Sequence, residues 1–499
     1  MLILMSCDTV NDSAHNRGDE VMKKVICPIL SGIVLIVFLF PGIAVSDSEN
    51  PNTDWFKDAG YGIFVHYLEH LQNDADHLHS LGKDTAWDEC VRDFDTERFA
   101  DDVLESGAGY AIFTVMQISR FMIAPNATFD RITGYQPGEA CATRDLIEDL
   151  YQSLSKRNIK LMLYWTGDGP RADEKAGPAY GCGNPVSKEF VQKWADTFRE
   201  YGERYGDKIA GIWCDGSYSF IGYDEEKLGI LAEGLRAGSE KRIIALNPGV
   251  DPRVQAYTSH EDYTCGEQNT FYEVPVERFI NGEQWHILSF LSKTWWGEPG
   301  VGYSKSQFSE YVWNVNQRGG VVSVDIMVYR DGGLDRSQVE LLKAVRHELQ
   351  EGTERPPVPP CNKAYRKPAK LLSLDGSHPL PVNGNVQFPW LGVDGKVDTI
   401  AQAAEEWPWT YEVDLVDTLA IQRVKITFGI GYATVFDIKV SEDGQNWKTL
   451  KNITGHDGKP CEVSFDPVAA RYVRVCGIKP DAENQPGIQM AIAELEVYE

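Results

Sequence analysis

The sequence predicts an α/β fold, a (β/α)8-type barrel, followed by an antiparallel β-sandwich. Eight short apolar runs recur between residues 61 and 328, and most of them are separated by segments with helical periodicity. After residue 365 this periodicity gives way to short runs of alternating polar and apolar residues. Apolar runs covered by helices are typical of parallel sheets, and eight such units indicate a closed barrel.

The eight runs are mostly too continuously apolar for strands with one solvent-exposed face. They span residues 62–66, 110–115, 160–165, 211–215, 242–247, 262–267, 285–290 and 321–328. In a parallel barrel the chemistry gathers at the carboxyl ends of the strands, where His66, Asp215, Glu267 and Asp325 fall. We therefore expect these side chains at one mouth of the barrel.

The chain divides into three parts after residue 50. Residues 50–350 form the predicted barrel domain, which ends on an amphipathic helix over 337–351. Residues 351–364 contain Pro-Pro-Val-Pro-Pro and predict a stiff, extended linker. Residues 365–499 carry alternating runs separated by Gly, Asn and Asp turns, at 410–415, 421–426, 436–441 and 471–476, and predict a jelly-roll sandwich.

The first 46 residues are interpreted as an extension and a leader. Residues 1–21 are polar and irregular, which favours a start at Met22 and makes them an upstream extension from a misassigned start. Residues 22–46 contain two lysines, an apolar stretch and small residues before Asp47, the pattern of a signal peptide. A retained membrane anchor is the alternative, since the run approaches spanning length. Pro28 and Pro41 favour cleavage, which predicts a secreted or periplasmic protein without a membrane partner.

The amino-acid composition limits the classes of molecule that the protein can bind. The formal net charge is −26, with 74 acidic and 48 basic side chains, so nucleic acids and anionic membranes would be repelled. The 13 Trp, 22 Tyr and 20 Phe predict a well-filled core, although aromatic faces also stack on sugar rings. Cysteines show no zinc-ligand spacing, and Cys214 and Cys265 are interpreted as small buried hydrophobic residues.

Two acids carry the catalytic hypothesis. Asp215 precedes Gly216, and Asp-Gly alone is commonly a turn. Its place after an apolar strand, at the catalytic face, indicates a functional residue instead, and Glu267 closes the sixth run. Two carboxylates at one barrel mouth in an exported, aromatic-rich chain suggest glycoside hydrolysis, with one as nucleophile and the other as acid and base.

Residues 55–345 resemble glycoside hydrolase family 29, the retaining α-L-fucosidases. The matching segments are 55–66, 94–115, Ile-Trp-Cys-Asp-Gly at 212–216, 262–267, Trp-Trp-Gly at 295–297 and Arg-Gly-Gly at 318–320. The resemblance implies that Asp215 is the nucleophile, that Glu267 is the acid/base, and that His66 contacts the sugar. Trp296 belongs to a matching segment and is a candidate for substrate binding.

One segment departs from the family pattern. Where the family carries Lys-His-His-Asp-Gly-Phe, this chain has Met-Gln-Ile-Ser-Arg-Phe at 116–121. Gln117 keeps hydrogen-bonding capacity toward a sugar. Arg120 adds a fixed charge suited to a sulfate or carboxylate, and the alternative is an ion pair with a neighbouring acid.

Three aromatic residues complete the substrate-binding candidates. Tyr164 and Trp165 end the third run and are candidates for ring stacking, with core packing as the alternative. Trp213 lies beside Asp215, and an apolar surround that includes it would help to keep Glu267 protonated.

Most of residues 365–499 resemble the coagulation factor 5/8 type C (discoidin-like) modules, many of which bind carbohydrate. The matching segments are 393–399, 411–415, 440–447, 470–475 and 493–498. The resemblance implies a structural calcium near Asp394, Thr399 and Glu494, and hard oxygen ligands suit that ion. Ordinary turn residues at Asp394 and Asp398 are the alternative.

Together these observations predict an exported, retaining glycosidase acting on α-L-fucosides, or on a related deoxy or sulfated sugar linkage, in glycans or polysaccharides. Catalysis is expected to need no cofactor. The first alternative is a catalytically impaired carbohydrate-binding protein on a glycosidase scaffold. The second is a surface adhesin held by an uncleaved N-terminal helix.

Overall fold

The computed structural model describes residues 50–250, 254–271, 273–275, 277–351, 362–365, 367–380, 388–403, 408–480 and 490–499. The predicted extension and signal peptide, and most of the predicted linker, lie outside the described residues. Within those ranges, none of the helices has the length and hydropathy that a membrane crossing requires.

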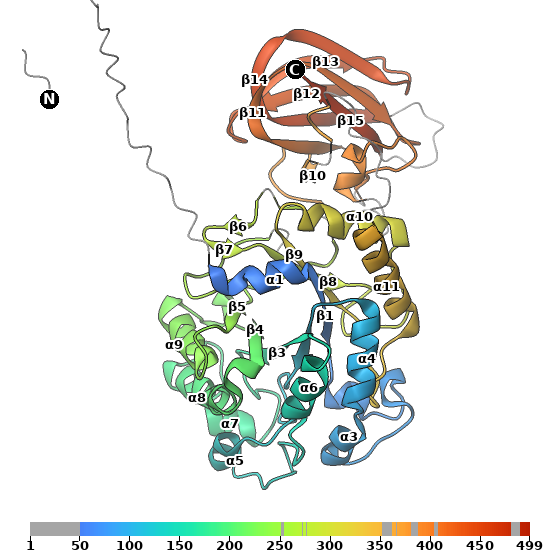
Figure 1. Ribbon diagram of the computed structural model, residues 1–499. Coiled ribbons are helices and arrows are strands. Elements are labelled where there is room, and N and C mark those ends of the chain that lie inside the picture. Colours follow the sequence, from blue (N-terminus) through green and yellow to red (C-terminus); the bar gives the residue numbers. More distant parts are fainter. Residues whose placement is uncertain are drawn as a thin grey trace, which may run out of the picture. The chain divides into compact units, whose positions relative to one another are not determined.

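A curled parallel sheet forms the centre of the first domain (Figure 1). Its seven strands run in the order β5-β4-β3-β2-β1-β9-β8. They are β1 (Tyr61–Val65), β2 (Tyr110–Thr114), β3 (Lys160–Thr166), β4 (Ile209–Asp215), β5 (Ile243–Leu246), β8 (His286–Phe290) and β9 (Val321–Asp325). Seven of the eight predicted runs therefore form one barrel-like sheet, which confirms the predicted fold class.

Helices connect the strands and cover the outer side of the sheet (Figure 1). The longer ones are α4 (Thr96–Ser106), α6 (Leu146–Ser155), α8 (Lys188–Tyr205), α9 (Glu225–Arg236), α10 (Lys305–Asn316) and α11 (Arg336–Glu351). The shorter ones are α1 (Asp54–Ala59), α2 (Glu69–Gln72), α3 (Trp87–Asp93), α5 (Ala127–Thr133) and α7 (Ala176–Tyr180).

Local capping explains where these helices begin and end. The carboxylate of Asp95 accepts hydrogen bonds from the first free N–H groups of α4, and Gly107 ends that helix at φ +80°. Ser304 and Gln307 form a reciprocal capping box at the start of α10. The predicted C-terminal helix of the barrel domain is confirmed as α11.

The sixth predicted run lies between β5 and β8 without forming a continuous strand. Toward β8 it is held by backbone bonds, in which Leu288 donates its N–H to the carbonyl of Gly266 at 2.9 Å. Gly266 has φ +62°, and a Cβ there would lie 2.0 Å from a backbone oxygen of β8, so this position requires glycine.

On the side of this segment that faces β5, hydrogen bonds to side chains take the place of the missing backbone ladder. The N–H of Ile244 donates to a carboxylate oxygen of Asp262 at 2.9 Å, and the N–H of Leu246 donates to Glu261 at 3.1 Å. A backbone bond from Asp262 to the carbonyl of Ile244 accompanies them. The edge amides of β5 are thus satisfied although the neighbouring segment is irregular. We call this junction the carboxylate seam.

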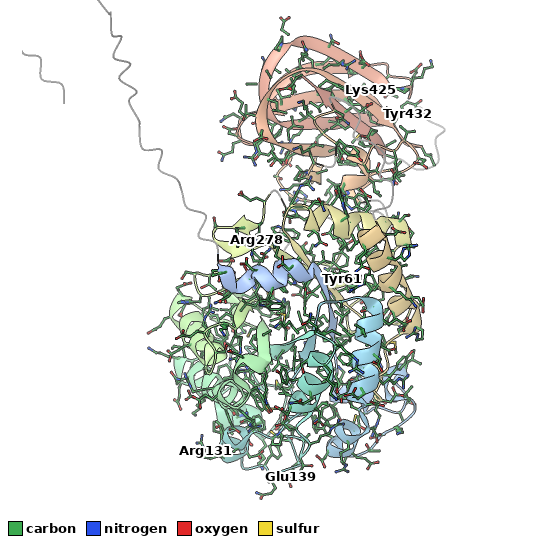
Figure 2. The ribbon with its side chains drawn as sticks, viewed as in Figure 1. Tyr61, Arg131, Glu139, Arg278, Lys425 and Tyr432 are labelled. Atoms are coloured by element: carbon green, nitrogen blue, oxygen red, sulfur yellow. The ribbon has the colours of Figure 1, made fainter. Side chains whose placement is uncertain are left out.

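Side-chain hydrogen bonds anchor the strand ends that lie away from the predicted mouth of the barrel. Tyr61 begins β1 and donates its hydroxyl to the carbonyl of Ser106, at the end of α4, at 2.7 Å (Figure 2). Arg278 lies on the loop before β6 (Phe279–Ile280) and donates to Asp54 at 2.7 Å, which anchors α1 (Figure 2). The short strand β6 pairs with β7 (Glu283–Gln284).

The second domain is antiparallel, as predicted. Its strands are β10 (Ala369–Ser373), β11 (Trp409–Phe428), β12 (Ala433–Ser441), β13 (Lys448–Thr454), β14 (Cys461–Pro480) and β15 (Ile492–Tyr498). Two predicted runs, 410–415 and 421–426, belong to the single long strand β11. Its ladder with β14 is interrupted between Asp414 and Leu419, where Val416 has φ +74°.

Candidate active site

A cavity of about 330 Å³ lies at the carboxyl ends of the barrel strands. It is lined by Phe64, His66, Gln117, Tyr164, Trp213, Asp215, Glu267, Leu288, Thr294, Trp295 and Trp296. We call it the central cavity. The structure thus brings together both predicted acids and five of the predicted substrate-binding residues, which come from two strands, β3 and β4, and from four segments that lie outside the strands.

Asp215 ends β4, and three neutral donors hold its carboxylate. Tyr164 donates its hydroxyl to Oδ2 at 2.8 Å, and Tyr218 donates its hydroxyl to Oδ1 at 2.7 Å. The side-chain amide of Asn247 donates to the same Oδ1 at 2.9 Å. A carboxylate held on both oxygens cannot rotate freely, so Asp215 presents a fixed negative charge to the cavity.

Glu267 has a different environment. It accepts one hydrogen bond, from Asn247 Nδ2 to Oε2 at 2.7 Å. Burial and the nearby charge of Asp215 raise the pKa of Glu267 to about 7, and the bond from Asn247 opposes that rise. A carboxyl group whose pKa lies near neutral pH, beside a second carboxyl group in a different environment, is the arrangement used for acid–base chemistry on two carboxyl groups.

Asn247 also fixes the separation of the two acids. Its single amide nitrogen donates to both, so the two acceptor oxygens lie at most about 5.6 Å apart, the sum of the two bond lengths. Retaining glycosidases hold their carboxyl groups about 5–5.5 Å apart, and inverting ones about 6.5–9.5 Å apart to admit a water molecule. The upper limit of about 5.6 Å between these two oxygens fits the shorter spacing.

His66 is oriented by a buried acid. Its Nδ1 lies 3.0 Å from Oδ1 of Asp325, the last residue of β9. The other oxygen of Asp325 accepts the N–H of Gly297 at 3.1 Å. Because Nδ1 donates to Asp325, a neutral His66 carries an acceptor at Nε2, which suits a sugar hydroxyl.

Aromatic side chains form the walls of the central cavity. Tyr164 and Trp213 stack with ring centroids 5.7 Å apart and planes 20° apart. Phe64 meets both of them edge-on at 5.6 Å. Trp296 is 47% exposed at the rim and holds φ +71°, a conformation that non-glycine residues adopt rarely. This lining offers apolar faces to a sugar ring and its substituents.

Two predicted substrate-binding residues lie elsewhere. Trp165 is fully buried and stacks on Trp194 of α8 at 4.5 Å, so it is a core residue. The reason is strand geometry, because adjacent residues of β3 point to opposite faces and Tyr164 takes the inner one. Arg120 is not among the residues that line the central cavity, and it pairs with Asp173 at 2.9 Å.

Sequence reasoning missed two residues that hold the acids. Asn247 directly follows β5, at the carboxyl end where functional side chains gather. The rule that selected Asp215 and Glu267 could therefore have selected Asn247 as well. Tyr218 lies in the loop after β4 and had no comparable signal. Cys214 and Cys265 are buried free thiols, as predicted.

The predicted calcium ligands lie together in the second domain. The hydroxyl of Thr399 donates to both oxygens of Asp394 at 3.0 Å, and Gly395 donates its N–H to Glu494 Oε2 at 3.1 Å. Burial, and then the charge of Asp394, raise the pKa of Glu494 to about 9. Within the described ranges no three His, Cys, Asp or Glu side chains form a metal-binding group.

Two family models match different parts of the chain. The model of the alpha-L-fucosidase family matches residues 83–351, and that of the NedA-like, galactose-binding domain matches residues 391–475. No curated protein matches the chain.

Solved structures resemble either most of the chain or a smaller part of it, at low similarity. A Ruminococcus gnavus family 29 fucosidase in complex with fucose is 13% identical over 91% of this chain and 95% of its own, with a TM-score of 0.41. A putative alpha-L-fucosidase from Bacteroides thetaiotaomicron is 14% identical over 91% and 97%, with a TM-score of 0.43. A chitosan-binding module from Paenibacillus sp. IK-5 is 28% identical over 28% and 98%, with a TM-score of 0.24.

Proposed function

This chain belongs to the alpha-L-fucosidase family, whose model covers more than half of its length, and its barrel is therefore a glycoside hydrolase domain. We propose that it releases a terminal α-L-fucosyl residue, or a closely related uncharged deoxysugar, from glycans, with retention of anomeric configuration. The observation that carries this proposal is the Asn247 amide, which donates to both Asp215 and Glu267.

The proposed reaction proceeds in two steps. Asp215 attacks the anomeric carbon while the bond to the leaving oxygen breaks, and Glu267 gives its proton to that oxygen. Glu267, now a carboxylate, then takes a proton from water, whose oxygen attacks the same carbon and releases Asp215. The spacing of at most about 5.6 Å between these two oxygens supports this route, because inverting enzymes hold their carboxyl groups about 6.5–9.5 Å apart.

The lining of the central cavity supports an uncharged sugar. No Arg or Lys is among the residues that line it, and Arg120 is already paired with Asp173. A sulfate on the sugar would therefore be desolvated without a fixed cation beside it. The apolar walls suit the methyl group of a 6-deoxy sugar, while His66 and Gln117 offer hydrogen bonds to its hydroxyls.

Turnover of α-L-fucosyl fluoride and 4-nitrophenyl α-L-fucoside tests the proposal. The wild type is expected to cleave both, with α-L-fucose as the first product by proton NMR. Asp215→Ala is expected to lose at least about 10³-fold in kcat, because the covalent step is removed. First release of β-L-fucose would overturn retention. Saturable sugar binding without turnover would instead favour the catalytically impaired binding protein.

The second domain is proposed to bind carbohydrate and calcium. Glu494 Oε1 is buried without a hydrogen-bond partner among the described residues, and the carboxylate of Asp394 lies close by. An orphaned buried carboxylate oxygen fits a hard cation, so Asp394, Thr399 and Glu494 would supply ligands for a structural calcium.

Export is proposed from the sequence, since residues 22–46 lie outside the described residues. N-terminal sequencing of the mature protein tests it, and a start near Asp47 is expected.

A further inference from the structure

Three histidines from the connection between β1 and α3 form a group beside Trp296. His70 belongs to α2, and its ring meets that of Trp296 edge-on with centroids 5.5 Å apart. His79 lies in a short 3-10 helix (Leu78–Ser80) and bonds to the backbone of Trp296, and His77 contacts His79. None of the three is among the residues that line the central cavity, whereas Trp296 is. The reaction described above gives them no role.

Buried side chains hold the peptide group between Trp296 and Gly297 from both sides. Its carbonyl oxygen accepts a hydrogen bond from His79 Nε2 at 3.1 Å, and its N–H donates to Oδ2 of Asp325 at 3.1 Å. The carbonyl of Gly297 also accepts from His79 Nε2, at 3.0 Å. Because His79 and Asp325 are both buried, water competes little for these bonds. Two side chains from different elements therefore set the orientation of this peptide plane.

The backbone at this point is in a conformation that needs such support. Trp296 has φ +71° and Gly297 has φ +65°. Glycine adopts these angles freely, and a Cβ at Gly297 would lie 2.7 Å from the carbonyl oxygen of Ile326. Tryptophan meets a steric penalty there, so the conformation persists only where the surroundings hold it. Without the bonds from His79, the backbone of Trp296 is expected to relax and its indole to move.

His77 fixes the proton arrangement of the His79 ring. The two carbonyl oxygens that face His79 Nε2 can only accept, so this nitrogen carries a hydrogen. Burial, and then the charge of His77, lower the pKa of His79 to about 4. The ring is therefore neutral near neutral pH, and its Nδ1 is an acceptor. His77 Nδ1 lies 2.9 Å from that atom and donates to it, which aims Nε2 at the two carbonyls.

The backbone of His79 is itself anchored. Its carbonyl accepts the N–H of Arg330 at 2.8 Å. The guanidinium of Arg330 is fully buried and donates to the side chains of Asn73 and Thr85, both at 2.6 Å. These bonds tie the loop that carries His79 to the segment that follows β9. His79 thus approaches Trp296 from a fixed position.

We propose that His79 is a positioning residue of the central cavity. Aimed by His77, it holds the Trp296–Gly297 peptide and so keeps the indole of Trp296 in the wall against which the sugar binds. This inference rests on the proposed function and adds to it a residue that does not touch the substrate. Since His79 acts through Trp296, its loss should matter only while Trp296 is present.

Steady-state kinetics on 4-nitrophenyl α-L-fucoside gives the first test. His79→Leu is expected to lower kcat/KM about tenfold, because two hydrogen bonds from one ring nitrogen are lost. The loss should lie mainly in KM, since a cavity wall contacts the sugar both before and during the reaction. His79→Gln places an amide N–H where Nε2 lies and should keep most of the wild-type value. His378→Leu, at an exposed histidine of the second domain, is the control.

A double variant separates positioning from general destabilisation. His79→Leu combined with Trp296→Ala should have the same kcat/KM as Trp296→Ala alone, because two residues that act through one contact are not additive. Independent effects would multiply instead.

Fluorine NMR of protein labelled with 5-fluorotryptophan follows Trp296 without turnover, and Trp296→Phe identifies its resonance. This resonance is expected to shift or broaden in His79→Leu and to stay in place in His79→Gln and His378→Leu. If His79→Leu does not fold, His77→Ala should show the same change to a smaller extent.

An unmoved Trp296 resonance overturns the inference. A moved resonance with an unchanged KM, or losses that multiply in the double variant, overturns it as well. In each of these cases the proposed function stands as long as the wild type cleaves the fucoside. If the wild type cleaves no fucoside, the proposed function fails, and the fluorine spectra alone decide whether His79 positions Trp296.

Discussion

The imidazole of His66 lies 3.0 Å from the carboxylate of Asp325, which is fully buried at the end of β9. Two strands that are adjacent in the sheet thus contribute one hydrogen-bonded unit, in which only His66 lines the cavity. The acid sets which ring nitrogen carries the proton and where the ring points, so its effect on the substrate is indirect.

Asp325→Asn is expected to reduce kcat/KM by about 10–100-fold, because a hydrogen bond to a charged group contributes about 1.5–3 kcal/mol. The substitution allows the wrong imidazole tautomer while it preserves size. Steady-state kinetics on an aryl fucoside measures the effect, and His66→Ala is the reference. Equal kinetics in Asp325→Asn and wild type would show that His66 needs no orientation.

Asn247→Ala is expected to change the pH profile as well as the rate. The bond from Asn247 lowers the pKa of Glu267, so its loss moves the basic limb of kcat/KM to higher pH. The rate at pH 6 should fall by about 10–100-fold, since both acids lose a donor. Asn452→Ala, in the second domain, is the control. A lower rate with an unmoved basic limb would contradict the role assigned to Asn247.

Glu267→Gln is expected to stabilise the barrel in alkaline but not in acidic solution. Folding raises the pKa of Glu267 from its ordinary value of 4.5 to about 7. Below pH 4.5 the group is protonated in both states and contributes nothing. Between pH 4.5 and about 7 the unfolded state releases this proton while the folded state retains it, so stability falls as the pH rises, and above about 7 the loss is complete.

The gain from Glu267→Gln above pH 8 should be about 1–3 kcal/mol in the free energy of unfolding. Thermal unfolding at pH 4.5 and pH 8.5 measures it. Glu203→Gln, an exposed glutamate on α8, serves for comparison. A gain of the same size at both pH values would rule out the ionisation of Glu267 as its cause.

Calcium removal is expected to destabilise the second domain. Chelation with EGTA should lower its melting temperature by about 5 °C, because an ion that binds the folded state stabilises it by mass action. Glu494→Gln should abolish that response, whereas Glu442→Gln, an exposed residue of the same domain, should keep it. A wild type insensitive to both calcium and EGTA would contradict the proposed site.

Strand periodicity was sufficient to locate most of the barrel. Continuously apolar runs indicate strands that are covered on both sides. The carboxyl-end rule predicted neighbouring positions for four side chains, and the structure has His66, Asp215 and Glu267 in the central cavity and Asp325 behind His66. Adjacent side chains of a strand point to opposite faces, so Tyr164 and Trp165 could not both line the cavity. Applying this rule to the third run would have removed Trp165 from the predicted site.

Contacts between loops could not be predicted in the same way. Tyr218 reaches Asp215 from a loop, and Arg120 meets Asp173 across 53 positions of the chain. Such pairs depend on how each loop folds back, and hydropathy patterns carry no information on that. The irregularity of residues 262–267 had a visible sign in Gly266, but its cause, the close approach of β8, required the structure.

The carboxylate seam gives the two acids of the proposed mechanism, Asp215 and Glu267, unequal backbone support. Asp215 ends β4, a strand paired by backbone ladders with β3 on one side and β5 on the other. Glu267 belongs to the segment that meets β5 largely through side chains. A nucleophile returns to the same carbon atom in both half-reactions and gains from immobility. An acid/base group must serve a departing oxygen first and an arriving water second. In the proposed mechanism Glu267 takes this role from the segment whose backbone pairing is the less regular of the two.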